Sequence, residues 1–144
     1  MTLQPLHAWT GTIAAHRDWV RGWIANPKQR EQFETDWNTK IHVVCAVGSQ
    51  LDLDDTSGWQ ALGVVFGDAL SMVTGYPWAE LTDEYGTAPC LVINAAAEAA
   101  LFPLTMLSKR AEGGECPDTD VIADLFQHAI DHGRQVENLL ASES

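Results

Sequence analysis

Apolar residues recur every three or four positions over five stretches of the chain, which is the period of an amphipathic helix. In the first stretch Trp9, Ile13 and Val20 fall on one face, and Asn26-Pro27 is typical of a helix end. The pattern predicts helices from residue 9 to the Asn26-Pro27 pair, from about 32 to 50, from 54–56 to 75, from 103 to 110, and from about 118 to 140.

Two of these helices also carry suitable end residues. An acid or hydroxyl at 54–56 can accept hydrogen bonds from the first free N–H groups of the third helix, and Gly75 tolerates the left-handed backbone that ends it. Asp118 or Thr119 can cap the last helix in the same way. Both helix starts are therefore predicted from side-chain chemistry as well as from the period.

The period changes near residue 78. Residues 78–83 alternate apolar and polar, 84–87 are typical of a turn, and 90–93 form a short apolar run, so the pattern predicts a hairpin. Residues 95–100 suit a helix by composition, while 100–102 could instead add a strand to a small sheet. We therefore expect an α+β fold with about five helices packed on a small antiparallel sheet or hairpin.

Length and composition indicate one domain over residues 1–144. The chain is 46% apolar and contains six tryptophans, whereas disordered acidic segments are poor in large aromatic residues. We divide it into a Trp-rich helical part, residues 1–50, and a motif-bearing core, residues 54–135. The start lacks a signal-peptide pattern, and no apolar stretch reaches the ~20 residues of a membrane span. Three cysteines without a CxxC pair are typical of reduced thiols, so we expect a cytoplasmic protein.

Negative charge is concentrated in the second part of the chain. Sixteen of the twenty carboxylates lie beyond Gln50, where only Lys109, Arg110 and Arg134 oppose them, so that part carries about −13 and residues 1–50 about +1. Such a field repels phosphate backbones and anionic lipid but attracts basic surfaces. We therefore expect a basic protein as the partner, with no binding to nucleic acid or membranes.

Two short patterns resemble metal sites but lack essential ligands. His128, Asp131 and His132 have the spacing of an inverted zinc-protease motif, but an aspartate stands where that motif needs glutamate. The aspartates of 52–55 lack the central glycine and final glutamate of a calcium loop. Nucleophile, phosphate-loop and dinucleotide motifs are also missing. We predict no metal, no cofactor and no enzymatic activity.

Two charged groups are the most informative candidates. Asp83, Glu84 and Tyr85 place two carboxylates and a phenol at the expected hairpin turn, and Lys109 and Arg110 are two of the only three cations beyond Leu51. We favour a structural ion cluster in which Lys109 and Arg110 neutralise Asp83 or Glu84. In the alternative interpretation, the acids and Tyr85 form an exposed ligand or partner site.

Five segments resemble, in this order, a bacterial domain family of unknown function. They are LGVVFGDAL at 62–70, GYPW at 75–78, DEYG at 83–86, FPLTMLSKR at 102–110 and DVIADLF at 120–126. The resemblance covers about residues 54–135 and implies a helix, a Trp-containing strand, an acidic turn, a Pro-led segment and a final helix. It implies no catalytic residues.

In charge and size the chain is similar to bacterial immunity proteins, which occlude the active site of a toxin. We expect an acidic protein-binding module of this kind, with contacts from Asp83, Glu84, Tyr85, Asp124 and Asp131.

Two alternatives remain open. The first is a ligand-binding or enzymatic domain with a pocket between the hairpin of residues 78–93 and Lys109-Arg110. The second is a homodimer that buries the surface of Trp9, Trp19 and Trp23 between its copies.

Overall fold

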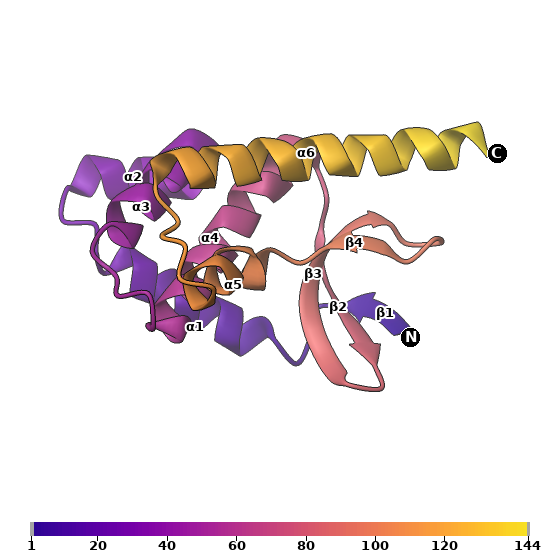
Figure 1. The fold of residues 1–144 in the computed structure, drawn as a ribbon, viewed down its shortest axis with the longest axis horizontal. Helices are drawn as coiled ribbons and strands as arrows, with labels where there is room; N and C mark the ends of the chain where they lie inside the picture. Colours follow the sequence, from indigo (N-terminus) through magenta and orange to yellow (C-terminus); the bar gives the residue numbers. More distant parts are fainter. Residues whose placement is uncertain (1, 144) are drawn as a thin grey trace.

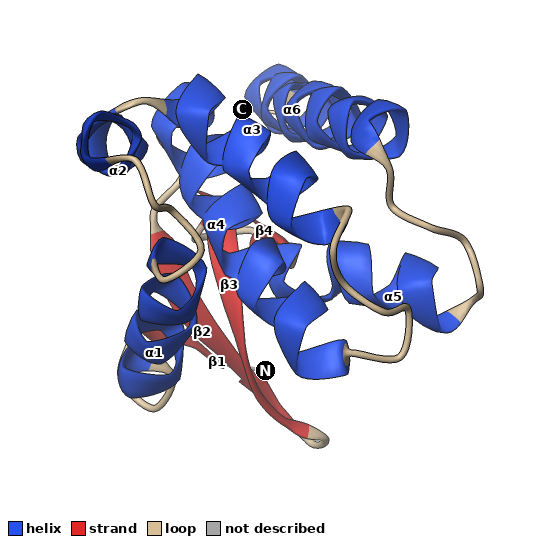
Figure 2. Ribbon diagram, turned by 90° about the vertical axis from the view of Figure 1, so that its left-hand side faces the viewer, coloured by secondary structure: helices blue, strands red, loops and turns tan. Residues whose placement is uncertain are grey.

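Helix α4 (Thr56–Thr74) runs through the middle of the structure, and the other elements pack around it (Figures 1 and 2). The computed structural model describes residues 2–143. Eleven of the 19 residues of α4 are buried, as expected for a helix that is apolar on most of its sides. The surrounding helices are α1 (Thr10–Arg21), α2 (Pro27–Thr35), α3 (Trp37–Gly48), α5 (Met106–Glu112) and α6 (Thr119–Ser142), and a short 3₁₀ turn, η1 (Pro103–Thr105), precedes α5.

Four antiparallel strands form one sheet in the order β1-β2-β3-β4. They are β1 (Thr2–Pro5), β2 (Trp78–Asp83), β3 (Gly86–Asn94) and β4 (Ala99–Leu101). β2 and β3 are the predicted hairpin, with Trp78 opposite Leu91 and Asp83 opposite Gly86. Six α-helices packed with this sheet, within residues 2–143, confirm the predicted α+β fold class.

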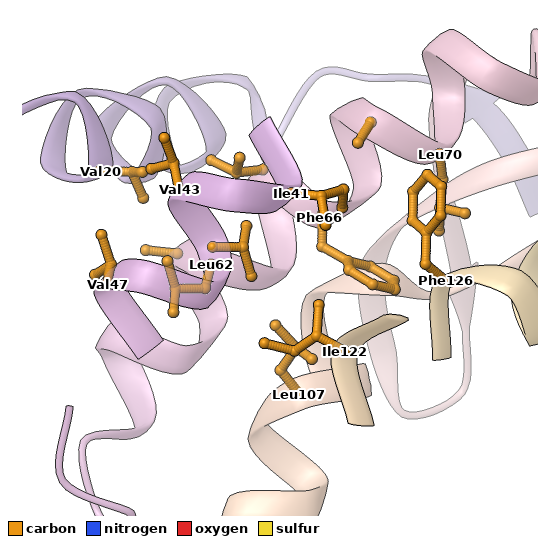
Figure 3. Packing of buried hydrophobic residues seen from close by; sticks show 14 of the residues in the cluster. Val20, Ile41, Val43, Val47, Leu62, Phe66, Leu70, Leu107, Ile122 and Phe126 are labelled. Carbon is orange, nitrogen blue, oxygen red and sulfur yellow. The ribbon is translucent and has the colours of Figure 1, made fainter. Parts of the chain in front are cut away.

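The main core joins α4 to α3, α5 and α6 (Figure 3). Phe66 of α4 meets Phe126 of α6 edge to face at 5.6 Å between ring centroids, and Trp37 of α3 stacks on the same Phe126 ring at 5.4 Å. Leu107 and Ile122 are fully buried beside them. Burying each such side chain contributes roughly 2 kcal/mol, so this contact holds α6 on the rest of the protein.

The predicted helix caps at α4 and α6 are confirmed. Asp55 Oδ1 accepts a hydrogen bond from the Gly58 N–H at 2.9 Å, and Asp118 Oδ1 accepts one from the Val121 N–H at 2.9 Å. Gly75 ends α4 with a φ of 80°, a left-handed conformation that favours glycine.

The helix predicted from about 32 to 50 is wrong in its first part. Asp36 has extended backbone angles, φ −121° and ψ 115°, so it ends α2 and begins α3. Its side chain accepts a hydrogen bond from the Asn38 N–H at 3.2 Å and thereby caps α3. Pro27 opens α2 behind the cap residue Asn26, where a missing N–H has no cost.

Among the described residues, no helix is both long enough and apolar enough to cross a membrane.

Candidate functional site

The hairpin turn exposes Asp83, Glu84 and Tyr85 to solvent. Tyr85 is 90% exposed, and its N–H donates a hydrogen bond to Asp83 Oδ1 at 2.8 Å. Gly86 follows with a φ of +131°, which favours glycine. Tyr85, Asp83 and the exposed Phe102 line a shallow hollow of about 230 Å³. The hollow therefore brings the Tyr85 ring of the turn and the Phe102 ring, which follows β4, beside the carboxylate of Asp83.

Helix α6 carries the other predicted contact residues. Asp124 and Asp131 are exposed, and Asp131 Oδ1 accepts a hydrogen bond from Gln127 Nε2 at 2.9 Å. His128 and His132 are exposed on the same helix. Within residues 2–143, no group of three His, Cys, Asp or Glu side chains is placed to hold a metal ion.

The structure does not bring these two sets of acids together. Helix α6 runs along the top of the molecule in Figures 1 and 2, whereas the turn between β2 and β3 points to the bottom in both views. A partner that contacts Tyr85 at the turn is therefore on the opposite side from Asp124 and Asp131.

The structure differs from the expected ion cluster of Lys109 and Arg110. Arg110 Nη1 donates to the two carboxylate oxygens of Glu115 at 3.1 and 3.0 Å, because the end of α5 faces the loop that leads to α6. Lys109 is exposed, and within residues 2–143 no ion pair joins either cation to Asp83 or Glu84.

Arg110 instead lines a cavity with residues of α6. This cavity of about 390 Å³ includes Asp124 and His128 but no residue of the hairpin. Arg110 and the hairpin turn thus lie at different hollows of the surface.

Arg110→Ala is expected to change the free energy of unfolding by less than ~1 kcal/mol, because its pair with Glu115 is solvent-exposed. Thermal melting followed by circular dichroism measures the change. A loss of several kcal/mol would show that Arg110 has a structural role that its contacts with Glu115 do not explain.

The tryptophans considered for a homodimer do not form one exposed face. The Trp9 indole N–H donates to the Thr87 carbonyl at 2.9 Å, and the ring packs on a small core that contains Ile13. Trp19 and Trp23 are exposed and meet edge to face at 5.8 Å between centroids. A dimer contact at this surface would involve these two rings without Trp9.

A charged cavity that the sequence analysis did not predict lies between α1, α2, α3 and α4. Its volume is about 310 Å³. At one side the Arg17 guanidinium forms a double hydrogen bond with Asp68, from Nε to Oδ2 at 2.8 Å and from Nη2 to Oδ1 at 2.7 Å. These bonds raise the pKa of Arg17 above its ordinary value. The Trp78 indole N–H also donates to Asp68 Oδ1, at 2.9 Å. Asp68 therefore joins α1 to α4 and β2.

A second arginine of the cavity wall, Arg21, is also paired with carboxylates. Arg21 donates from Nε and Nη2 to the carboxylate of Glu34, and from Nη1 to Asp18. These hydrogen bonds hold the pKa of Glu34 below its ordinary value. Both of the carboxylates that line the cavity, Glu34 and Asp68, are thus engaged by arginines.

Lys40 of α3 lines the same cavity and is only 6% exposed. Its ammonium lies over the Phe33 ring at 4.4 Å from the centroid. Burial lowers the pKa of Lys40, and the nearby charges of Asp68 and Glu34 counteract this effect. Within residues 2–143, no carboxylate lies within 4.0 Å of the ammonium.

Glu80 of β2 positions α1, and with it Arg17 and Arg21. The side chain is fully buried, and Oε1 accepts hydrogen bonds from the backbone N–H groups of His7 at 2.7 Å and Trp9 at 2.6 Å. Burial alone would raise the pKa of Glu80, but these hydrogen bonds outweigh it, and the pKa is below the ordinary 4.5. A carboxylate from the sheet thus satisfies the positive start of α1, where Trp9 offers no side-chain cap.

Sequence reasoning missed this cavity because its residues are far apart in the chain. Asp68 and Arg17 are separated by 51 positions. One signal was present: Asp68 interrupts an otherwise apolar stretch of a buried helix, and a carboxylate in such a place needs a cation.

Residues 40–122, more than half of the chain, match a family described as a domain of unknown function, DUF3806. The chain belongs to this family. The predicted resemblance is confirmed, although the DUF3806 match begins and ends earlier than the expected 54–135. Lys40, Asp68 and Trp78 lie inside the DUF3806 segment, whereas Arg17 and Arg21 precede it. No curated protein matches the sequence.

The fold is similar to that of a protein from Bacteroides thetaiotaomicron VPI-5482 with a crystal structure at 1.50 Å resolution. The TM-score is 0.64 and the sequence identity is 20%, and the similarity covers 91% of this chain and 47% of that one. The chain therefore corresponds to about half the length of that protein, and the likeness concerns the fold.

Proposed function

We propose that the protein is an acidic protein-binding module of the bacterial immunity type, which acts in the cytoplasm and neutralises a basic toxin by covering its active site. The observation that carries this proposal is Tyr85, which is 90% exposed at the hairpin turn beside Asp83 and Glu84. Tyrosine is enriched among residues that dominate binding energy, since its large ring loses little conformational entropy when it is buried. The flanking carboxylates suit a basic rim around that ring.

The net charge of −12 supports the same proposal through association kinetics. A strongly acidic surface accelerates encounters with a basic protein, and salt screens this attraction beyond ~8 Å. Asp124 and Asp131 lie on the side opposite to the turn, so their role in this proposal is long-range attraction, while Tyr85 makes the contact.

The first experiment uses the product of the neighbouring gene, which should co-purify with the protein if that gene encodes the toxin. With that partner, the association rate should fall as salt rises, while the dissociation rate should change much less. Stopped-flow fluorescence measures both rates. Failure to bind, or an association rate that salt does not affect, contradicts the proposal.

Tyr85→Ala should weaken this complex by roughly 2 kcal/mol, about thirtyfold in Kd, and leave the melting temperature unchanged. The melting temperature should stay the same because the Tyr85 ring is exposed and packs on little of the protein. Leu139→Ala is the matched control, because Leu139 is 65% exposed on α6, away from the turn. Equal affinities of wild type and Tyr85→Ala would place the contact elsewhere.

A further inference from the structure

The cavity between α1, α2, α3 and α4 brings together three of the eight cations of the chain. Arg17, Arg21 and Lys40 contribute three positive charges to its wall, and Glu34 and Asp68 contribute two negative ones. The chain around it has a net charge of −12. Asp18, at 2.7 Å from Arg21, balances the third positive charge, so the hollow of about 310 Å³ is close to neutral within a strongly acidic chain.

Among residues 2–143, Lys40 is the cation of this cavity that has no carboxylate partner. Arg17 and Arg21 each form a double hydrogen bond with a carboxylate, whereas the Lys40 ammonium has no carboxylate within 4.0 Å among residues 2–143. Because Lys40 is 94% buried, its ammonium loses much of its hydration, which costs free energy. The cation–π contact with the Phe33 ring offsets only part of this cost. A core built for stability alone would be expected to hold an apolar side chain at this position.

We propose that the cavity binds a small oxyanion, a carboxylate or phosphate group, between the Lys40 ammonium and the Arg17 guanidinium. Of the five N–H donors of Arg17, the one on Nε and one of the two on Nη2 bind Asp68, which leaves the second Nη2 donor and both Nη1 donors for a ligand. The Lys40 ammonium adds three donors. Arg21 uses three of its five N–H donors on Glu34 and Asp18, so it has fewer donors left for a ligand than Lys40 has.

The size and the wall of the cavity restrict the ligand further. A volume of about 310 Å³ is at the lower end of the range for small-molecule sites. Phe33 and Met72 supply apolar surface beside the cations. The cavity therefore fits inorganic phosphate or a small molecule with one anionic group and a short apolar part.

The Lys40→Met variant separates this role from a structural one. Methionine keeps the apolar stem of lysine and removes its charge, so the variant should melt at the same or a higher temperature than the wild type if Lys40 serves a ligand. If Lys40 is structural, the variant should melt lower. Lys28→Met is the matched control, because Lys28 is exposed on α2 and does not line the cavity.

The test measures melting temperature in sodium phosphate, sodium acetate and sodium chloride at equal ionic strength. Phosphate or acetate should raise the melting temperature of the wild type and of Lys28→Met more than chloride does, and the affinity should fall about tenfold or more in Lys40→Met. The anion with the larger effect identifies the source of the oxyanion. Equal effects of all three salts, or an undiminished effect in Lys40→Met, would overturn the proposal.

Amide chemical shifts give an independent measurement that does not need the variant to fold. Titration of the wild type with phosphate or acetate should shift the amide signals of Arg17, Lys40 and Ser71, which surround the cavity on three helices. Shifts that are centred on other residues would contradict binding at this place.

Discussion

Glu80→Ala is expected to lower the free energy of unfolding by roughly 3 kcal/mol. The substitution removes the buried acceptor of the His7 and Trp9 N–H groups, which it binds at 2.7 and 2.6 Å. Two part-buried backbone donors then lose their acceptor, and the start of α1 loses the negative charge that its dipole favours. Because α1 carries Arg17, the effect extends to the charged cavity.

Denaturant unfolding, followed by tryptophan fluorescence, measures this loss. Glu84→Ala on the same hairpin is the control, since Glu84 is exposed at the turn and its removal should leave stability nearly unchanged. Equal stabilities of the Glu80→Ala and Glu84→Ala variants would contradict the role assigned to Glu80.

The contribution of the Glu80 carboxylate to the free energy of unfolding is expected to depend on pH. The folded state holds the pKa of Glu80 below 4.5, so folding favours the charged form. Its contribution to stability is fully present above pH 4.5 and is lost as the pH falls through the lower pKa of the folded state. Glu80→Gln keeps an oxygen for the two N–H groups but cannot titrate. The stability difference between wild type and Glu80→Gln should therefore shrink on acidification, and a constant difference would mean that Glu80 is uncharged in the fold.

Local signals predicted the helices and the hairpin well, because their causes lie within a few residues. Asp55 and Asp118 cap helices through bonds to N–H groups three positions later, and Gly75 ends α4 through its own φ. The alternation over residues 78–83 located the strand but not its burial, since Ala79, Glu80 and Leu81 are all buried. Such features need no knowledge of the rest of the chain.

Elements that depend on distant partners were not predictable in this way. Strand β1 exists because Leu3 and Gln4 pair with Leu81 and Glu80 of β2, and four residues offer too short a pattern to show a period. The break between α2 and α3 at Asp36 was hidden because apolar residues continue at helical spacing beyond it.

The same distinction between local and distant causes applies to the candidate functional residues. Exposure of Asp83, Glu84 and Tyr85 follows from a polar turn between two strands, so the sequence alone indicates it. The pairing of Arg17 with Asp68 requires α1 to lie across α4, and no local rule supplies that arrangement. Charge counting along the chain therefore located the acids that face solvent and misplaced the structural ion pair.

Gly63, in the LGVVFGDAL segment, lets η1 pack closely against α4. At Gly63 a Cβ atom would lie 2.6 Å from the Leu104 carbonyl oxygen and 2.7 Å from that of Pro103. Both obstacles are backbone atoms of η1, which cannot move away as a flexible side chain could. The absence of a side chain at Gly63 is thus what allows η1 to approach α4, and it places Leu104 against Ile13 and Val64.

Gly63→Ala is expected to reduce the free energy of unfolding by roughly 2 to 3 kcal/mol, since overpacking against backbone outweighs the gain of about 1 kcal/mol in helix propensity. Gly11→Ala on α1 is the matched control. No heavy atom lies within 4 Å of the Cβ position at Gly11, so the same substitution should there stabilise the protein by about 0.5 to 1 kcal/mol. The two variants therefore have opposite expected signs in one denaturation series, and a stabilised Gly63→Ala would show that η1 can withdraw from α4 at little cost.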